Sequence, residues 1–470
     1  MLFSPPLAKA ASVAVLLGAL ASGGCVNVQP SGAPLPQASD AAHARLDAEL
    51  AAVVADKAHP LMSLSALVVR DGKIVYHRQF GMRWIDPARP EQGKPADAAT
   101  MYRIASISKL ATTLGVLRLV EEGKLDLDAD IGGYLGYRVR NPHFPGDPVT
   151  LRMLLTHTSS LRDDGGYYWE AGVDLKDVLT PGGALYGSGA MWAKNAKPGA
   201  YFQYANLPWG IAATVMERAS GERFDRLMAR LILQPMGLRG GFHPADFSAE
   251  DLANTATLYR KREATGFERW DIAGPWIPQV DDYGKSPPVP RAGPGYVVGS
   301  NGTAIGPAGG LRISAADLGR IMLMLMNKGM HEGKRILKPE TVDLMLKTAW
   351  QRDDKGRNGD PNGESGFGRH LDFFNAWGLG TQRFLDLSGP NRGDRLAEDG
   401  GLKWAGHLGD AWGLTSAMVF DPERKNGMIY FVGGPGFNPE TYPGVYSSFY
   451  RHEELILTAL YRRAVLGRAE

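Results

Sequence analysis

The sequence predicts a mixed α/β fold, in which an antiparallel sheet is built from both ends of the chain. Near the N-terminus, two β-rich runs, Leu64–Arg70 and Lys73–Phe80, are separated by Asp71-Gly72, a two-residue hairpin signal. Near the C-terminus, a second predicted turn joins the apolar runs Leu414–Phe420 and Met428–Val432. The chain between the hairpins shows mainly helical patterns. We therefore expect terminal helices beside the sheet and a large, mostly helical insert.

The composition fits a globular protein with many loops. The chain has 470 residues, enough for one large or two medium domains. It carries 52 basic and 50 acidic residues, a formal net charge of +2, and no basic run is interleaved with aromatic residues. We therefore expect no nucleic-acid partner. The 59 glycines and 31 prolines predict many turns around the core.

The N-terminus has the layout of a secretory signal. An apolar run, Ala10–Leu20, follows Lys9 and precedes small residues that end at Cys25, the only cysteine. The run is too short for a stable membrane span. It resembles a bacterial lipoprotein signal, although Ser22 stands where that pattern prefers Leu. We expect residues 1–24 to be the signal peptide, Cys25 to be acylated and 25–40 to be a flexible tether, which implies an exported, membrane-anchored protein of the periplasm or cell envelope. Plain cleavage and a retained anchor are the alternatives.

Residues 41–467 are expected to form a single domain. Its sheet part comprises 41–100 and 375–467, and its helical part comprises 101–350. The domain opens with a helix capped by Asp40, since apolar residues recur at helical spacing from Leu46 to Val54.

The stretch Tyr102–Leu119 is the candidate start of an active site. Ser106 and Lys109 stand three residues apart and so share one face of a helix. This helix is apolar on nearly every side, which is typical of burial. It would place a nucleophile, a candidate base and a positive helix end together. Alone, the pattern would favour a helix cap followed by a solvated lysine.

Further helices are expected along the insert. Leu151–Leu161 combines a helix with His157, which could serve as a base for neighbouring hydroxyls, although a structural role at the helix end is favoured. Tyr204 and Asn206 precede a helix at Leu207–Val215, and Asn206 is a natural cap.

The remaining elements follow from periodicity and turn residues. Residues 253–305 show no clear period, and 351–369 read as an exposed loop. The other expected features are a helix at Leu227–Leu238, a helix within Gly309–Asn327 capped by Ser314, the motif His407-Leu408-Gly409 just before a strand, a turn at Asn426-Gly427, and a closing amphipathic helix at Ser448–Leu466.

Rival chemistries lack their motifs. The sequence has no Gly-x-Ser-x-Gly elbow, no His-Glu-x-x-His zinc helix, no phosphate loop and no dinucleotide fingerprint. Its ten histidines show no metal spacing. We therefore expect neither a cofactor nor a metal.

Three ordered motifs remain: Ser106 with Lys109, Tyr204-Ala205-Asn206, and His407-Leu408-Gly409. This set resembles the serine β-lactamase and penicillin-binding superfamily, closest to its class C branch with the related esterases and D-stereospecific peptidases. The resemblance covers most of residues 43–465 and includes the framework stretches Leu154–Leu161, Pro198–Asn206 and Ala308–Leu318.

The resemblance implies a β-lactamase-like fold and a role for each motif. Ser106 would be the acylated nucleophile, and Lys109, with a lowered pKa, would accept its proton. Tyr204 would relay a proton to the leaving group, and either Lys109 or Tyr204 could be the general base. Asn206 would hydrogen-bond the substrate or Lys109. The backbone N–H groups of Ser106 and Asp410 would form the oxyanion hole.

The third motif departs from a typical β-lactamase. His407 replaces the Lys of Lys-Thr-Gly, and Leu408 replaces a Thr whose hydroxyl would bind a substrate carboxylate. His407, Gly409 and Asp410 thus complete the substrate-binding set with Asn206. An unperturbed histidine titrates near 6.5, so His407 is expected to lose positive charge across the neutral range unless its site shifts it strongly. A neutral His407 that only orients Tyr204 or Ser106 is the alternative.

The expected function is that of a serine hydrolase acting through an acyl-enzyme on a small-molecule ester, amide or D-amino-acid peptide, or on a β-lactam-like substrate. One alternative is a peptidoglycan-binding or penicillin-sensing homologue that acylates slowly or not at all. The intact proton-transfer groups argue against it. Another alternative, a scaffold lipoprotein, depends on the anchor alone. Substrate identity should lie in loops 162–198 and 253–305.

Overall fold

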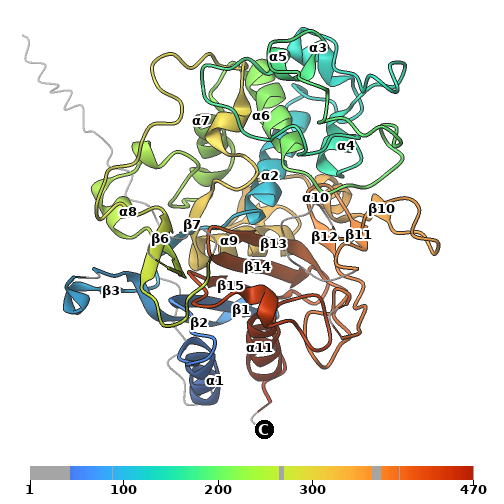
Figure 1. Cartoon of the computed structure of the whole chain (residues 1–470). Coiled ribbons are helices and arrows are strands. Elements are labelled where there is room, and N and C mark those ends of the chain that lie inside the picture. The colour runs from blue at the N-terminus through green and yellow to red at the C-terminus, as the bar shows by residue number, and fades with distance from the viewer. Residues whose placement is uncertain (1–42, 87, 264–268, 363–371, 391, 469–470) are drawn as a thin grey trace, which may run out of the picture. The chain divides into compact units, whose positions relative to one another are not determined.

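Nine strands form the main sheet of the computed structural model, in the order β10-β11-β12-β13-β14-β15-β1-β2-β3, and all their pairings are antiparallel (Figure 1). The strands are β1 (Ser63–Arg70), β2 (Lys73–Trp84), β3 (Lys94–Pro95), β10 (Trp350–Gln351), β11 (Ala376–Trp377), β12 (Gln382–Arg383), β13 (Ala405–Ala411), β14 (Leu414–Asp421) and β15 (Asn426–Val432). Because β15 pairs with β1, the sheet joins the two ends of the chain, as the sequence predicts.

The structure describes residues 43–86, 88–263, 269–362, 372–390 and 392–468, which belong to one compact unit. The expected signal peptide and tether, with Cys25, lie outside the described residues, and so does the expected cap Asp40. Within the described ranges, no helix combines the length and the apolar character needed to cross a membrane.

Helices cover both faces of the sheet (Figure 1). The helices are α1 (Ala44–Val54), α2 (Ile107–Glu121), α3 (Ile131–Leu135), α4 (Leu151–Leu155), α5 (Leu175–Leu179), α6 (Leu207–Ser220), α7 (Phe224–Met228), α8 (Ala249–Ala253), α9 (Ala315–Met326), α10 (Pro339–Leu346) and α11 (Arg451–Ala459). Three two-stranded pairs complete the fold: β4 (Met101–Arg103) with β7 (Arg312–Ser314), β5 (Leu258–Lys261) with β6 (Trp276–Val280), and β8 (Met330–His331) with β9 (Lys334–Arg335).

Alternate residues of the central strands serve two separate cores. On β1, Leu67 and Val69 pack into the core that contains α2 and α9. Their neighbours Ala66 and Val68 pack with α1 and α11 on the other face. Successive side chains of a strand point to opposite faces, so this sheet is buried on both sides. The terminal helices thus form one layer, and the insert begins on the other.

Most of the predicted elements are confirmed. Asp71 and Gly72 both take positive φ angles, of 52° and 73°, in the turn between β1 and β2. Ser314 caps α9 by accepting a hydrogen bond from the backbone N–H of Asp317 at 3.1 Å. The expected helix at Leu227–Leu238 is instead the end of α7 followed by a π-helical turn, Ala229–Leu233.

The second hairpin turns earlier than the sequence predicts. Asp421 pairs with Asn426, so residues 422–425 form the turn, with Lys425 at a φ of 53°. Gly427 lies inside β15, where a Cβ atom would stand 2.6 Å from Sδ of Met322. A close approach of α9 to the sheet, rather than a turn, therefore explains this glycine.

Two predictions of irregular structure also need correction. Residues 253–305 include the hairpin β5–β6, and the motif His407-Leu408-Gly409 lies within β13 rather than before a strand. Glycines interrupt the apolar pattern of β13, because this strand passes close to other backbone segments.

Candidate active site

Ser106 stands between β4 and the first turn of α2, and its side chain is oriented by Lys109. The preceding residue, Ala105, takes a φ of 48°, which is a strained conformation for a residue with a Cβ atom. Ser106 occupies the N-cap position, but its side chain makes no capping hydrogen bond. Nζ of Lys109 donates a hydrogen bond of 2.9 Å to Oγ of Ser106. The alternative of a simple cap is therefore excluded.

Lys109 is completely buried, with 0% of its surface exposed. Its Nζ also donates to Oδ1 of Asn206 at 2.7 Å and to the carbonyl oxygen of Ala308 at 3.1 Å. Together with the hydrogen bond to Ser106, these two bonds use all three donors of an ammonium group. The sequence predicts that Asn206 bonds either the substrate or Lys109, and the structure shows the contact with Lys109.

Asp163 positions Asn206 and was missed by sequence reasoning. Asn206 stands at the N-cap of α6, yet its side chain does not cap the helix. The carboxylate of Asp163 takes that role, accepting from the backbone N–H of Asn206 at 2.8 Å and of Leu207 at 2.8 Å. It also accepts from Nδ2 of Asn206 at 2.7 Å, which leaves Oδ1 for Lys109. Asp163 lies in a loop without periodicity, so the sequence carries no signal for it.

Tyr204 is buried in an aromatic stack beside Lys109. Its ring centroid lies 4.9 Å from Nζ of Lys109. The ring stacks on His157, at 4.5 Å between centroids, and on Phe374, at 4.9 Å. Nδ1 of His157 accepts a 3.2 Å hydrogen bond from the N–H of Ala205, and burial, followed by Lys109, lowers the pKa of this imidazole. His157 therefore has the structural role that the sequence favours.

His407 is buried on β13 and is neutral. Its Nδ1 lies 2.7 Å from the carbonyl oxygen of Leu408, so Nδ1 carries the proton. Burial and then Lys109 lower the pKa of His407 to about 3. The exception stated for the sequence prediction therefore applies: burial and Lys109 shift the pKa strongly, and the alternative of a neutral His407 is the one that the structure supports. With Tyr204, His407 lines a small cavity beside the site.

Gly409 allows β13 to approach the turn before Ser106. A Cβ atom at this position would stand 2.4 Å from Oγ of Ser416 and 2.5 Å from the carbonyl oxygen of Ile104. Such separations are not tolerated, so no larger residue fits without displacing the strand. This approach brings Asp410, the next residue of β13, to the same cavity as Ser106.

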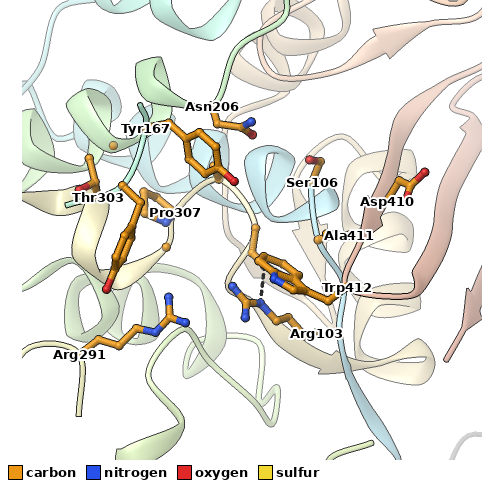
Figure 2. A pocket seen from close by; sticks show the side chains of 16 residues that line it. Arg103, Ser106, Tyr167, Asn206, Arg291, Thr303, Pro307, Asp410, Ala411 and Trp412 are labelled. Atoms are coloured by element: carbon orange, nitrogen blue, oxygen red, sulfur yellow. Dashed lines mark hydrogen bonds between the residues drawn. The ribbon is translucent and has the colours of Figure 1, made fainter. Parts of the chain in front are cut away.

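A cavity of about 470 Å³ opens at Ser106 (Figure 2). Besides Ser106, Asn206 and Asp410, its wall includes Arg103, Tyr167, Tyr168, Arg291, Thr303, Pro307 and Trp412. Both loops that were expected to determine substrate identity thus contribute to the wall. Hydroxyls of α2 hold the segment that follows the second loop: Oγ1 of Thr112 donates to the carbonyl oxygen of Pro307 at 3.0 Å, and Oγ of Ser108 accepts from the N–H of Leu311 at 3.0 Å.

Comparison with known families decides the class of the chain. Residues 46–444 match the family model described as beta-lactamase. The chain belongs to this family. It is accordingly a serine hydrolase, and the resemblance seen in the three motifs is confirmed.

Several relatives show how the β-lactamase family extends around this chain. Esterase EstB of Burkholderia gladioli is 28% identical over 83% of this chain and 91% of its own length. The D-alanyl-D-alanine-carboxypeptidase/endopeptidase AmpH of Escherichia coli K12 is 28% identical, but over 37% of this chain and 43% of its own length. The octameric penicillin-binding protein homologue from Pyrococcus abyssi shares the fold, with a TM-score of 0.56, 23% identity, and coverage of 85% of this chain and 74% of that one.

Within the described part of this β-lactamase-family chain, Asp225, His243 and Asp246 bring ligand atoms within 4.8 Å of one another. Arg223 already pairs with both carboxylates, at 2.6 Å to Oδ1 of Asp225 and 2.9 Å to Oδ2 of Asp246. The guanidinium group supplies the positive charge that a metal would provide, so we assign no metal to this group.

Proposed function

We propose that the protein hydrolyses carboxylic esters or amides through an acyl-enzyme on Ser106. The observation that carries this proposal is the 2.9 Å contact between Oγ of Ser106 and Nζ of the fully buried Lys109. With the amine neutral, the same contact lets the hydroxyl donate its proton to Nζ as Oγ attacks the substrate carbonyl carbon. We assign the role of general base to Lys109 because it contacts the nucleophile directly.

Tyr204 would take over the proton that Lys109 has accepted, and backbone N–H groups would stabilise the oxyanion. Tyr204, packed against Lys109, would return the proton to the leaving group as the bond to the acyl carbon breaks. Water would then attack the acyl carbon and give a proton to Lys109 or Tyr204, which would pass it to Oγ of Ser106 as the acid leaves. N–H groups of Ser106 and Asp410 would stabilise the oxyanion, each worth roughly 3 to 4 kcal/mol in another hydrolase.

Esters are the substrates that we favour. The similarity to an esterase extends over 91% of that relative. In addition, His407 and Leu408 replace the Lys and Thr that a β-lactamase offers to a substrate carboxylate, and His407 is neutral. D-Alanyl peptides are the second candidate, since AmpH is similar over 37% of the chain.

A purely binding role fits the site less well. A binding homologue has no need of groups that move protons, whereas here Lys109 contacts Ser106 and Tyr204 packs against Lys109. We place the enzyme in the periplasm or cell envelope, anchored through an acylated Cys25, because the apolar run and small residues before Cys25 have the layout of a lipoprotein signal.

A substrate panel tests the proposed activity. Purified protein is incubated with p-nitrophenyl esters, a chromogenic cephalosporin and D-alanyl-D-alanine peptides, in parallel with Ser106→Ala. Hydrolysis of esters above the Ser106→Ala background is expected. Cleavage of D-alanyl peptides alone would select the second candidate, and acylation without turnover of any class would favour the binding homologue.

A further inference from the structure

The active-site cavity ends in a positively charged wall. Figure 2 shows Ser106 at one side of the cavity and the guanidinium groups of Arg103 and Arg291 at the other. Arg103 comes from β4, and Arg291 comes from the long loop that follows β6. Neither residue takes part in the acyl-transfer steps proposed above, so the wall calls for another explanation.

The positive charge of this wall is only partly balanced. Arg312 donates to Asp281 through Nη2 at 2.7 Å and through Nε at 3.0 Å, so this carboxylate is already paired. Arg103 donates Nε to the carbonyl oxygen of Gly309 at 3.1 Å. Among the residues that the structure describes, no carboxylate lies within ion-pair distance of Arg103 or Arg291. The pKa of Arg103 is lowered, first by burial and then by the charge of Arg312, while the charge of Asp281 opposes this shift.

Aromatic rings hold both guanidinium groups. The guanidinium carbon of Arg103 lies 3.5 Å from the ring centroid of Trp412, and that of Arg291 lies 5.6 Å from the ring centroid of Tyr168. Arginine stacked on an aromatic ring loses little freedom when it binds a carboxylate, for which its planar fork is suited. The wall is therefore preorganised for an anion.

Asp410 is the acidic residue among those that line the cavity. Burial lowers the pKa of Arg260, and the negative charge of Asp410 opposes this shift. Arg260 lines a neighbouring cavity and is not part of the wall formed by Arg103 and Arg291. Asp410 lines that neighbouring cavity as well as the large one.

The position of Tyr204 indicates which part of a substrate reaches this wall. Tyr204 lines the small cavity with His407 and does not line the large one. If Tyr204 protonates the leaving group, the large cavity holds the acyl group that stays on Ser106. We propose that the enzyme selects substrates whose acyl group ends in a carboxylate, which Arg291 and Arg103 bind. This inference rests on the proposed hydrolase function.

Two esters that differ only in charge test the selection. Mono-p-nitrophenyl adipate carries a terminal carboxylate, and its methyl ester is the neutral match. We expect kcat/KM for the anion to exceed that for the methyl ester by about tenfold or more, as for a charge-assisted hydrogen bond. Arg291→Gln should remove this preference. Arg357→Gln, an exposed arginine outside the cavity wall, is the control that should keep it.

A second pair tests the orientation. The butyrate ester of 4-hydroxyphenylacetic acid carries its carboxylate on the leaving group, and we expect no preference for it over its methyl ester. A preference confined to this pair would show that the wall faces the leaving group and would overturn the acyl-side assignment. Equal kcat/KM values for the adipate pair would overturn the selection itself while leaving the hydrolase function intact.

Binding without turnover separates the two proposals. Ser106→Ala is titrated calorimetrically with monomethyl adipate and with dimethyl adipate, alone and combined with Arg291→Gln. The monoanion should bind more tightly by about tenfold, and the difference should disappear with Arg291→Gln. Tight binding of the monoanion without hydrolysis of any ester would contradict the hydrolase function alone. Equal binding of both compounds would contradict the anion site.

Discussion

The amide of Asn206 is held between a carboxylate and an ammonium group. Its Nδ2 donates to Asp163 at 2.7 Å, and its Oδ1 accepts from Lys109 at 2.7 Å. The contact with Asp163 fixes which end of the amide faces Lys109. Asp163 therefore influences the position of the nucleophile indirectly, because it orients Asn206, which in turn contacts Lys109.

Asp163→Asn should disturb this arrangement, because the new amide can serve the backbone N–H groups but cannot accept from Nδ2 of Asn206 without losing one of them. We expect kcat to fall by about tenfold or more, since small displacements of catalytic groups are costly. The free energy of unfolding should fall by roughly 1 to 3 kcal/mol. Asp174→Asn at the start of α5, where Asp174 accepts from the N–H of Lys176 at 2.8 Å, is the matched cap control. Equal kcat losses in both variants would contradict the positioning role.

A fluorophosphonate probe should attach covalently to Ser106, since this hydroxyl contacts Lys109. Ser106→Ala should abolish labelling and turnover and leave the thermal unfolding transition in place. Mass spectrometry locates the adduct. An adduct on Ser108, whose Oγ accepts from the N–H of Leu311, or on Ser160 would refute the assignment.

The lowered pKa of His407 predicts a loss of stability in acid. The pKa is about 3 in the folded protein and near 6.5 when unfolded, so the unfolded chain binds the proton first. The stabilising contribution is complete above about pH 6.5 and is lost as pH falls toward 3. Between pH 7 and pH 5 it should decrease by about 2 kcal/mol.

His407→Asn, which does not titrate, should remove this part of the pH dependence in denaturant unfolding measured at both pH values. His77, whose pKa is lowered to about 4 by burial and then by Arg78, shifts in the same direction and remains in both proteins. The comparison therefore isolates His407. A pH dependence unchanged by the substitution would show that His407 is not a neutral, buried imidazole.

Gly409→Ala should separate β13 from the turn before Ser106, because the added Cβ would stand 2.5 Å from the carbonyl oxygen of Ile104. We expect stability to fall by roughly 1 to 3 kcal/mol, the usual cost of overpacking, together with loss of ester hydrolysis. Gly133→Ala in α3, with nothing within 4 Å of the added Cβ, is the control. Full activity in Gly409→Ala would mean that the strand need not approach the turn so closely.

Cys25 predicts the location of the protein in a bacterial host. We expect the wild-type protein to sediment with membranes and to be released by detergent, and Cys25→Ser to block acylation and release the protein or stall its processing. Fractionation and mass spectrometry of the mature N-terminus measure both effects. Wild-type protein that is fully soluble, with an unmodified N-terminus, would remove the lipid anchor from the proposal.

The sequence by itself determined the hairpin at Asp71-Gly72, the buried helix at Ser106 and the order of the three motifs. These features depend on local physics: turn residues with positive φ, a helix apolar on every side, and residues three apart that share a helix face.

Only the tertiary structure decided that Asp163 holds Asn206, that β13 must contain Gly409, and that His407 is neutral. Each of these depends on interactions between segments far apart in the chain, such as the hydrogen bonds of Asp163 with α6 or the effect of the charge of Lys109 on His407 in β13. Burial and neighbouring charge set a pKa, and close backbone approach sets the need for glycine. No local pattern reports either condition, because both arise when distant segments pack together.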